Sequence, residues 1–228
     1  MRPYDGTQAL LRETTSANEF SVLGSCFMIL GSKRLILTAH HCVKDIPVKE
    51  MRIGLSWTRP LNFNCVEIYT HPSADIALVQ VDNDIPKGIR RRALPEDRAR
   101  LGMHLQCYGL TADYGGRTNR EFRLVEGVVQ RHLHYIDDPM HKTPAIELSA
   151  PIPKGMSGAP AFFAQGNDVV FGLAIGSKQS AIVDYEYEHV LKNGHENHVL
   201  RERIAEYGLV ADMFEVKEWL IDMHREHD

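Results

Sequence analysis

Cysteine is scarce in this sequence and forms no metal-binding pattern. Only four of the 228 residues are cysteines, and none of them belongs to a CxxC pair. A structural zinc site built from cysteine pairs is therefore not predicted. Histidine is more abundant, with 12 residues, but the pairs His132/His134 and His195/His198 lack a third ligand nearby. We expect these histidines to lie on the surface, and we predict no metal and no cofactor.

An excess of positive charge and long apolar runs are also missing. The chain carries 26 basic and 30 acidic side chains, a formal net charge of −4, so no positive field gathers phosphates and we predict no nucleic-acid partner. No segment approaches the roughly 20 apolar residues that span a bilayer, so we predict no membrane partner. The first 20 residues lack the apolar run and cleavage site of a secretory signal. We expect a cytoplasmic protein, or a secreted one if a leader has been removed.

Short apolar runs rich in β-forming residues recur along the chain. Hydrophobic residues make up 43% and charged residues 25%, which is typical of a globular protein with a sizeable core. The spacing of the runs, with glycine, proline, aspartate and asparagine between them, favours antiparallel barrels or sandwiches. The runs are residues 20–30, 34–39, 51–55, 63–71, 75–81, 104–110, 122–133, 145–149, 158–163 and 169–176.

A charged stretch over residues 83–102 separates these runs into two groups and indicates a connection between two halves. We place the N-terminal half at residues 1–90 and the C-terminal half at residues 91–228. The cluster Arg90–Arg92 is interpreted as a solvated face of this connection, with a docking patch as the alternative.

The chain changes character in its last third. From Glu186 to about residue 210 it is polar and charged, which suggests a surface insertion; gating of a cleft or binding of a partner is the alternative. Apolar residues then fall at helical spacing and predict an amphipathic helix over about residues 210–226 that packs on the strands. These residues are Met213, Val216, Trp219, Leu220 and Met223.

Three short motifs carry residues that act together in nucleophilic catalysis. LTAHHC ends a β-rich run at residue 42, HPSADIALV spans residues 71–79, and PKGMSGAP spans residues 153–160. A serine hydroxyl needs a neutral imidazole to accept its proton during attack. A carboxylate must orient that imidazole, and glycines beside the serine let backbone amides face a developing oxyanion. A nucleophile in the G-x-S-x-G turn of an α/β hydrolase is disfavoured, because there the histidine comes last in the chain.

This order of histidine, aspartate and serine resembles the chymotrypsin/trypsin family of serine peptidases over roughly residues 18–180. LTAHHC resembles the family's TAAHC signature, ADIALV its D-I-A-L element, and GMSGAP its G-x-S-G-x-P turn. The resemblance implies that His41 is the general base, Asp75 orients it and Ser157 is the nucleophile. It also implies an all-β fold of two antiparallel six-stranded β-barrels with a C-terminal α-helix, and a protein or peptide substrate.

The resemblance also assigns residues that would contact the substrate. The amides of Gly155 and Ser157 would form the oxyanion hole. Ala174, Ile175 and Gly176 would line the primary specificity pocket, with Gly176 leaving room for a substrate backbone to pair as an added strand. Ala174 stands where many relatives carry a serine bonded to the catalytic carboxylate, so a less supported Asp75 is expected.

Two departures from the family concern activation and specificity. The buried Ile-Val-Gly-Gly N-terminus is absent, and Met156 stands in place of its aspartate partner. The resemblance therefore leaves open a constitutive peptidase, a latent one awaiting an activating protein partner, and a catalytically inactive trypsin-like binding module. Asp184 could favour a basic residue in the pocket, although a surface position is the alternative.

The pair Cys26 and Cys42 has the spacing of the disulfide that closes the histidine loop in secreted members of the family. GSCF at residues 24–27 also resembles the GSGF of bacterial relatives that lack this bond. The resemblance leaves both states open for this pair, whereas Cys65 and Cys107 are expected to be buried free thiols.

Overall fold

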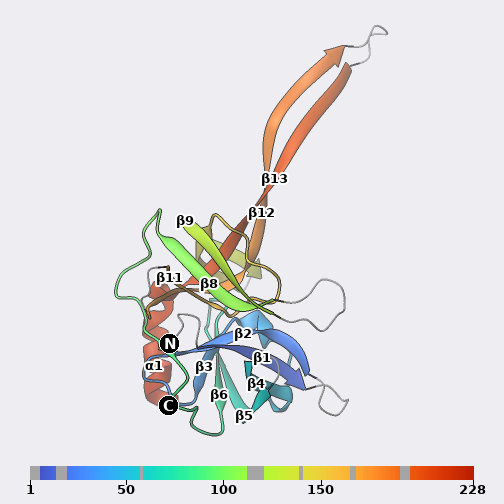
Figure 1. The fold of residues 1–228 in the computed structure, drawn as a ribbon. Coiled ribbons are helices and arrows are strands. Elements are labelled where there is room, and N and C mark those ends of the chain that lie inside the picture. Colours follow the sequence, from blue (N-terminus) through green and yellow to red (C-terminus); the bar gives the residue numbers. More distant parts are fainter. Residues whose placement is uncertain are drawn as a thin grey trace.

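The computed structural model describes residues 6–13, 20–56, 59–111, 121–138, 141–164, 168–190 and 196–228. Antiparallel strands form two barrels, one above the other in Figure 1, and one α-helix of the described residues runs beside them. No helix among these residues combines the length and the hydropathy needed to cross a membrane.

The first barrel is a ring of six strands in the order β1, β4, β5, β6, β3, β2, and pairing between β1 and β2 closes it. A short strand, β7, adds to β2 in parallel. Two 3-10 helices, η1 (His40–Cys42) and η2 (Val48–Glu50), connect strands of this ring. The strands are β1 Thr7–Glu13, β2 Phe20–Ile29, β3 Leu35–Thr38, β4 Met51–Ser56, β5 Arg59–Thr70, β6 Ala77–Val81 and β7 Arg91–Arg92.

The second barrel is closed by six strands in the order β10, β13, β12, β11, β8, β9. All its pairings are antiparallel, so the prediction of two six-stranded antiparallel barrels is confirmed. The division at residues 90 and 91 stays a prediction. The strands are β8 His104–Thr111, β9 Glu121–Asp138, β10 His141–Leu148, β11 Pro160–Phe163, β12 Val170–Val190 and β13 Glu196–Asp212.

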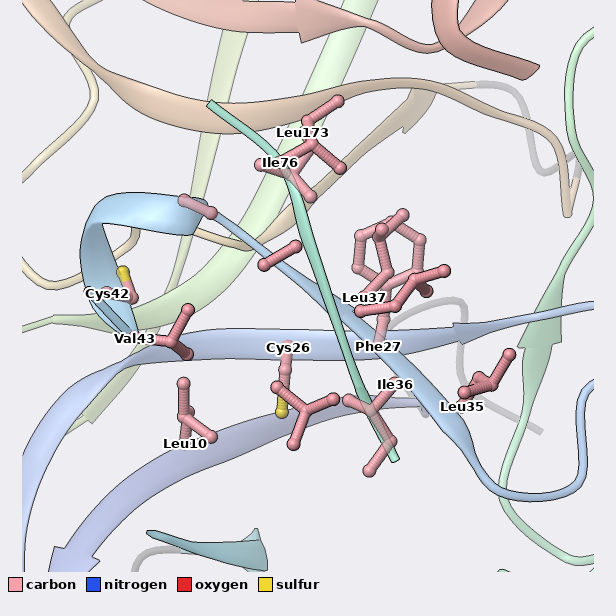
Figure 2. Packing of buried hydrophobic residues seen from close by; sticks show 14 of the residues in the cluster. Leu10, Cys26, Phe27, Leu35, Ile36, Leu37, Cys42, Val43, Ile76 and Leu173 are labelled. Carbon is pink, nitrogen blue, oxygen red and sulfur yellow. The ribbon is translucent and has the colours of Figure 1, made fainter. Parts of the chain in front are cut away.

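The core of the first barrel continues into the second barrel and the helix. Leu37 of β3 and Ile76, directly before β6, belong to the same buried cluster as Leu173 of β12 and Leu220 of the helix. Figure 2 shows Ile76, which follows Asp75 directly, in this cluster together with Leu173. Because Ile76 and Leu173 are fully buried, the segment that carries Asp75 is held against both barrels by apolar packing.

The C-terminal helix, α1, spans Met213–His227. The predicted helix is confirmed, and it begins three residues later than expected because β13 continues to Asp212. Asp212 caps the helix by accepting a hydrogen bond from the amide of Phe214 at 3.1 Å, as N-cap aspartates do. The carboxylate of Asp228 then accepts the amides of Lys33 and Arg34, each at 2.6 Å, so the end of the chain is bound to the first barrel.

In the arginine cluster of the connection, Arg92 is buried and Arg90 and Arg91 are half-buried, so the expectation of a solvated face is wrong. The side chain of Arg92 is only 1% exposed; its guanidinium lies 4.5 Å from the ring centre of Phe162 and 3.6 Å from the carboxylate of Asp168. Arg91 donates to main-chain carbonyls, that of Ser32 among them at 2.6 Å. A guanidinium becomes tolerable in the interior when carboxylate, carbonyl and aromatic groups surround it.

The polar stretch after Glu186 is built into two long strands. Beyond the barrel, β12 and β13 continue as a two-stranded antiparallel ribbon that projects from the molecule (Figure 1). The two strands pair from Ser177 opposite Gly208 to Val190 opposite Glu196. Leu148 of β10 still pairs with Gly208, and from Lys178 opposite Tyr207 outward no third strand of the described residues joins them. We call this ribbon, over residues 177–190 and 196–208, the arm.

Candidate active site

His41 and Asp75 meet because they stand at the ends of two paired strands. His41 lies in η1, directly after β3, and Asp75 lies two residues before β6. β3 and β6 are antiparallel neighbours, with Thr38 opposite Ala77. The carboxylate of Asp75 accepts the main-chain amide of His41 at 2.8 Å through Oδ1, and Oδ2 lies 2.6 Å from His41 Nδ1. The structure therefore brings these two predicted residues into direct contact.

The ionisation of this pair determines which imidazole nitrogen is available. Burial raises the pKa of Asp75, but the hydrogen bonds and charge of His41 outweigh it, and the net pKa is lowered. Burial lowers the pKa of His41, whereas the hydrogen bonds and charges of Asp75 and Cys42 raise it to about 10. Because an ionised carboxylate only accepts, Nδ1 keeps its hydrogen in the neutral imidazole. Nε2 is then the nitrogen that can accept a proton.

The main chain around Asp75 is bound to the second barrel. The amide of Asp75 donates to the hydroxyl of Thr143 at 2.8 Å, and the amide of Lys142 donates to the carbonyl of Ser73 at 2.8 Å. Thr143 is 1% exposed, so water does not compete for this hydroxyl. Sequence reasoning missed Thr143, and no motif around it in β10 could have identified it.

His71 supports the same segment from the other side. Its Nδ1 accepts the amides of Ser73 at 3.2 Å and Ala74 at 3.0 Å, and its ring meets that of Trp219 edge-on, with 5.0 Å between the ring centres. Burial lowers the pKa of His71, which favours the neutral form that these two bonds require. The motif HPSADIALV contained this histidine, but its position four residues before Asp75 gave no indication of the role.

Ser157 lies on a tight turn between β10 and β11. Gly155 and Gly158 on either side have φ values of +94° and +84°, a region that glycine adopts most easily. The Ser157 carbonyl accepts the amide of Ser25 at 2.7 Å and lies 3.8 Å from the Sγ of Cys42. The turn therefore packs against the residue that follows His41, and the structure places the serine motif beside the histidine motif.

The amides of Gly155 and Ser157 have no acceptor among the described residues, and neither has that of Lys154, which precedes them in the turn. Two neighbouring amides are engaged: that of Met156 donates to the Pro153 carbonyl at 3.2 Å, and that of Gly158 to the Ala174 carbonyl at 2.7 Å. Unpaired amides that flank a nucleophile can stabilise an oxyanion. The amides of Gly155 and Ser157 are the two that the sequence assigned to this task.

The predicted substrate strand forms the inner part of β12. Ala174 and Ile175 are buried, and the pairing with β13 shifts register between Ala174 and Gly176. Gly176 has a φ of +148°, and a Cβ at this position would meet nothing within 4 Å. The space into which a side chain at this position would project is therefore open. The side chain of Asp184 lies outside the described residues, so its proposed place in the pocket stays a prediction.

All four cysteines are buried free thiols in this structure, including Cys26 and Cys42. Burial raises the pKa of Cys107 to about 12, which keeps this thiol neutral and unreactive. Among the described residues no group of three or more His, Cys, Asp or Glu side chains could hold a metal ion. His132 instead donates from Nε2 to the Ala99 carbonyl at 2.8 Å, while His195 and the side chain of His198 lie outside the described residues.

The family model of the trypsin-like peptidase domain matches residues 24–173, a span that contains all three motifs. No curated protein matches the sequence.

Solved structures share the fold of this chain at low identity. The active form of the Rv3671c protease from M. tuberculosis is 18% identical with a TM-score of 0.65, over 96% of this chain and 81% of that one. The scabies mite inactivated protease paralogue S-I1 is 16% identical with a TM-score of 0.63, over 97% and 94%. The HtrA-type protease AlgW, solved with a decapeptide, is 16% identical with a TM-score of 0.62, over 98% and 65%.

Proposed function

The chain belongs to the trypsin-like peptidase family, and we propose that it is a serine endopeptidase with His41, Asp75 and Ser157 as its catalytic triad. The observation that carries the proposal is the pair His41–Asp75, joined at 2.6 Å, with the Ser157 turn packed against the neighbouring Cys42. In this arrangement the histidine is oriented by a carboxylate and the serine stands between glycines with two unpaired amides.

The proposed reaction follows from these roles. Ser157 Oγ attacks the carbonyl carbon of the scissile peptide bond while Nε2 of His41 takes the hydroxyl proton, and Asp75 stabilises the imidazolium. The negative charge on the carbonyl oxygen is held by the amides of Gly155 and Ser157. When the C–N bond breaks, His41 gives the proton to the leaving amine. Water then attacks the acyl-enzyme with His41 as base, and Ser157 is released with its proton.

The substrate would be an extended stretch of polypeptide that pairs with Ala174, Ile175 and Gly176 as an added strand. The open space beside Gly176 supports this, since a Cβ there would meet nothing within 4 Å. Main-chain pairing binds many sequences, and pockets beside the strand would select among them.

A second candidate is an inactive binding module, favoured by the fold similarity to an inactivated protease paralogue. Against it, His41, Asp75 and Ser157 are all present, and the contact between the first two is formed.

A third candidate is a peptidase that awaits an activating partner. Met156, in place of an aspartate, is fully buried among apolar side chains, so a new N-terminus would find no carboxylate there.

The test is covalent labelling with a fluorophosphonate probe followed by intact-mass analysis. This probe bonds to a serine that is activated by its base and oxyanion hole. We expect one adduct on the wild type and none on Ser157→Ala. Ser149→Ala, which removes an exposed serine of another turn, is the matched control and should label like the wild type. A folded wild type that takes up no probe would contradict a constitutive active site.

A further inference from the structure

The arm extends the strand that carries the proposed substrate-binding residues. β12 runs without a break in the strand from Val170 in the barrel through Gly176 to Val190. Beyond the barrel β13 is the one strand of the described residues that accompanies it, and the ribbon stands clear of both barrels in Figure 1. A two-stranded ribbon alone is marginally stable in water, so a projecting arm of this length is an unusual structural feature.

One edge of β12 is open from Ile175 outward. On the side opposite β13, β11 pairs with β12 only between Phe162–Val170 and Pro160–Leu173. Two hydrogen bonds continue this pairing by one residue, from the Ala174 amide to the Ala159 carbonyl and from the Gly158 amide to the Ala174 carbonyl. Past Ala174, no described residue occupies this edge. It presents a row of main-chain donors and acceptors, which is a template for another strand.

The root of the arm is braced next to the Ser157 turn. The hydroxyl of Ser177 accepts the amide of Ile152 at 2.8 Å and donates to its carbonyl at 3.0 Å. Opposite it, Gly208 packs so closely that a Cβ would lie 2.4 Å from the Ala150 carbonyl oxygen. The brace covers one face of the root, while Lys178 and the next two residues are exposed. The edge therefore begins from a rigid base and stays accessible.

We propose that the open edge of β12 beyond Gly176 binds the polypeptide upstream of the scissile bond as a third antiparallel strand of the arm. This inference rests on the proposed function, because the strand at Ala174–Gly176 supplies its starting point. Its polarity follows from the strand direction. β12 runs from the barrel toward the tip, so an antiparallel substrate would enter from the tip and reach Ser157 with its downstream end.

The occupant is the substrate because the edge is continuous with the substrate strand. A chain paired at Gly176 and continuing upstream in extended form meets the edge at Ser177–Ser180 without changing direction. Each pair of added residues makes further main-chain hydrogen bonds, and these bonds read no side chain. The arm would thus select unfolded or extended segments by length, since a folded domain offers no free strand to it.

The experiment compares peptides that differ only in length upstream. Two labelled peptides share the residues around the scissile bond chosen by library profiling on the wild type, and the longer one carries six additional upstream residues. Binding is measured on Ser157→Ala, so that no cleavage occurs. We expect the longer peptide to bind roughly tenfold tighter or more, because each net hydrogen bond contributes a several-fold change in affinity. A peptide extended by six downstream residues is the matched control and should show no such gain.

Two further measurements decide whether the arm edge causes the gain. N-methylation of single upstream amides should weaken binding at every second residue, which is the signature of strand pairing. A shortened variant joins Lys178 to Tyr207, a register pair, through an Asn-Gly turn. Once folding is verified by circular dichroism, it should bind both peptides equally.

If the protein with the full-length arm binds the long and the short peptide with equal affinity, the inference is overturned. A gain in affinity that survives N-methylation or arm shortening would also overturn it. The inference is also overturned if the full chain sediments as a dimer and the shortened variant as a monomer, because a second copy would then occupy the edge. If the wild type cleaves no peptide, the proposed function fails separately. The edge is then tested on the same protein with mixed-sequence pools of peptides of four and of ten residues, and the affinities of the two pools are compared in the same way.

Discussion

At the scale of the residue, the candidate site depends on one charged pair. Asp75 and His41 share two hydrogen bonds, both given by His41. The loss of a serine at Ala174 was expected to weaken the support of Asp75. The support comes instead through the main chain, where Thr143 and His71 hold the segment that precedes the carboxylate.

The pKa of His41 tests this pair. Burial lowers the pKa of His41, but the hydrogen bonds and charges of Asp75 and Cys42 raise it to about 10, so the folded protein binds this proton more tightly than the unfolded chain. The pair therefore contributes stability that is present below the unfolded pKa of 6.5 and is lost as the pH rises through the folded value. Asp75→Asn should lower the pKa of His41. NMR titration of the imidazole resonances in Ser157→Ala measures both values, with His41→Gln as the assignment control.

The same shift predicts the pH dependence of labelling. The general base must be neutral, so the rate of fluorophosphonate labelling should keep rising with pH above neutrality and level off only above about pH 10, as His41 loses its proton. A titration midpoint at or below 6.5 would contradict the ion pair that the structure shows.

Gly158 is the residue of the nucleophile turn with the least room. A Cβ would lie 1.9 Å from the Ser25 carbonyl oxygen and 2.5 Å from Thr38 Oγ1, at a φ of +84°. Gly158→Ala should lower the free energy of unfolding by roughly 2–5 kcal/mol, through overpacking and left-handed backbone strain. Urea unfolding checks this. Gly88→Ala is the matched control, since a Cβ at Gly88 would meet nothing within 4 Å, and it should be nearly neutral.

At the scale of the element, α1 is tied to the first barrel along its length. Its buried residues join the apolar cluster that the two barrels share, and the Tyr69 and His227 rings stack with 4.1 Å between their centres. Trp219 of the same helix contacts the ring of His71, and His71 holds the segment that precedes Asp75. The helix therefore packs against the barrel that bears His41 and Asp75.

Leu220 measures how much the helix contributes. It is fully buried on α1, so Leu220→Ala should lower the free energy of unfolding by about 2–5 kcal/mol, from lost burial and the cavity left behind. Glu218→Ala, at an exposed position of the same helix, should change it by less than about 0.5 kcal/mol. Similar effects for the two variants in urea unfolding would show that α1 does not pack as a core element.

At the scale of the whole molecule, the site is completed by contacts between the barrels. Ser25 of the first barrel bonds to Ser157, and Thr143 of the second bonds to Asp75. The buried Arg92 lies over Phe162 of the second barrel. These contacts fix the position of one barrel against the other next to the His41–Asp75 pair and the Ser157 turn.

Thr143→Val tests this coupling. The change keeps the shape of the buried side chain but leaves the Asp75 amide without its acceptor, which should cost roughly 1–3 kcal/mol of unfolding free energy. Because Asp75 would be less well positioned, kcat should fall by about 10-fold to 100-fold while KM changes little. Thr143→Ser keeps the hydroxyl and should restore kcat. A Thr143→Val enzyme with unchanged kcat would show that the bond has only a structural role.

The sequence alone determined the local features of this protein. Short apolar runs with turn residues between them predicted the strands, because the period of a strand is set by its own residues. The apolar spacing from Met213 to Met223 predicted the helix for the same reason. The three motifs, through their resemblance to the chymotrypsin/trypsin family, pointed to His41, Asp75 and Ser157 as candidates, since residue types and their order along the chain are visible without coordinates.

Only the tertiary structure decided the contacts between distant residues. Thr143 lies 68 positions from Asp75, and no local pattern links them. Arg92 looks solvated in a charged stretch, yet the fold encloses it between the barrels. The sequence predicts only a polar surface insertion after Glu186, because polar residues show no periodic pattern of burial. The strands of the arm are held by main-chain pairing, which every residue type except proline can supply. Burial and long-range hydrogen bonding arise only when the chain has closed on itself.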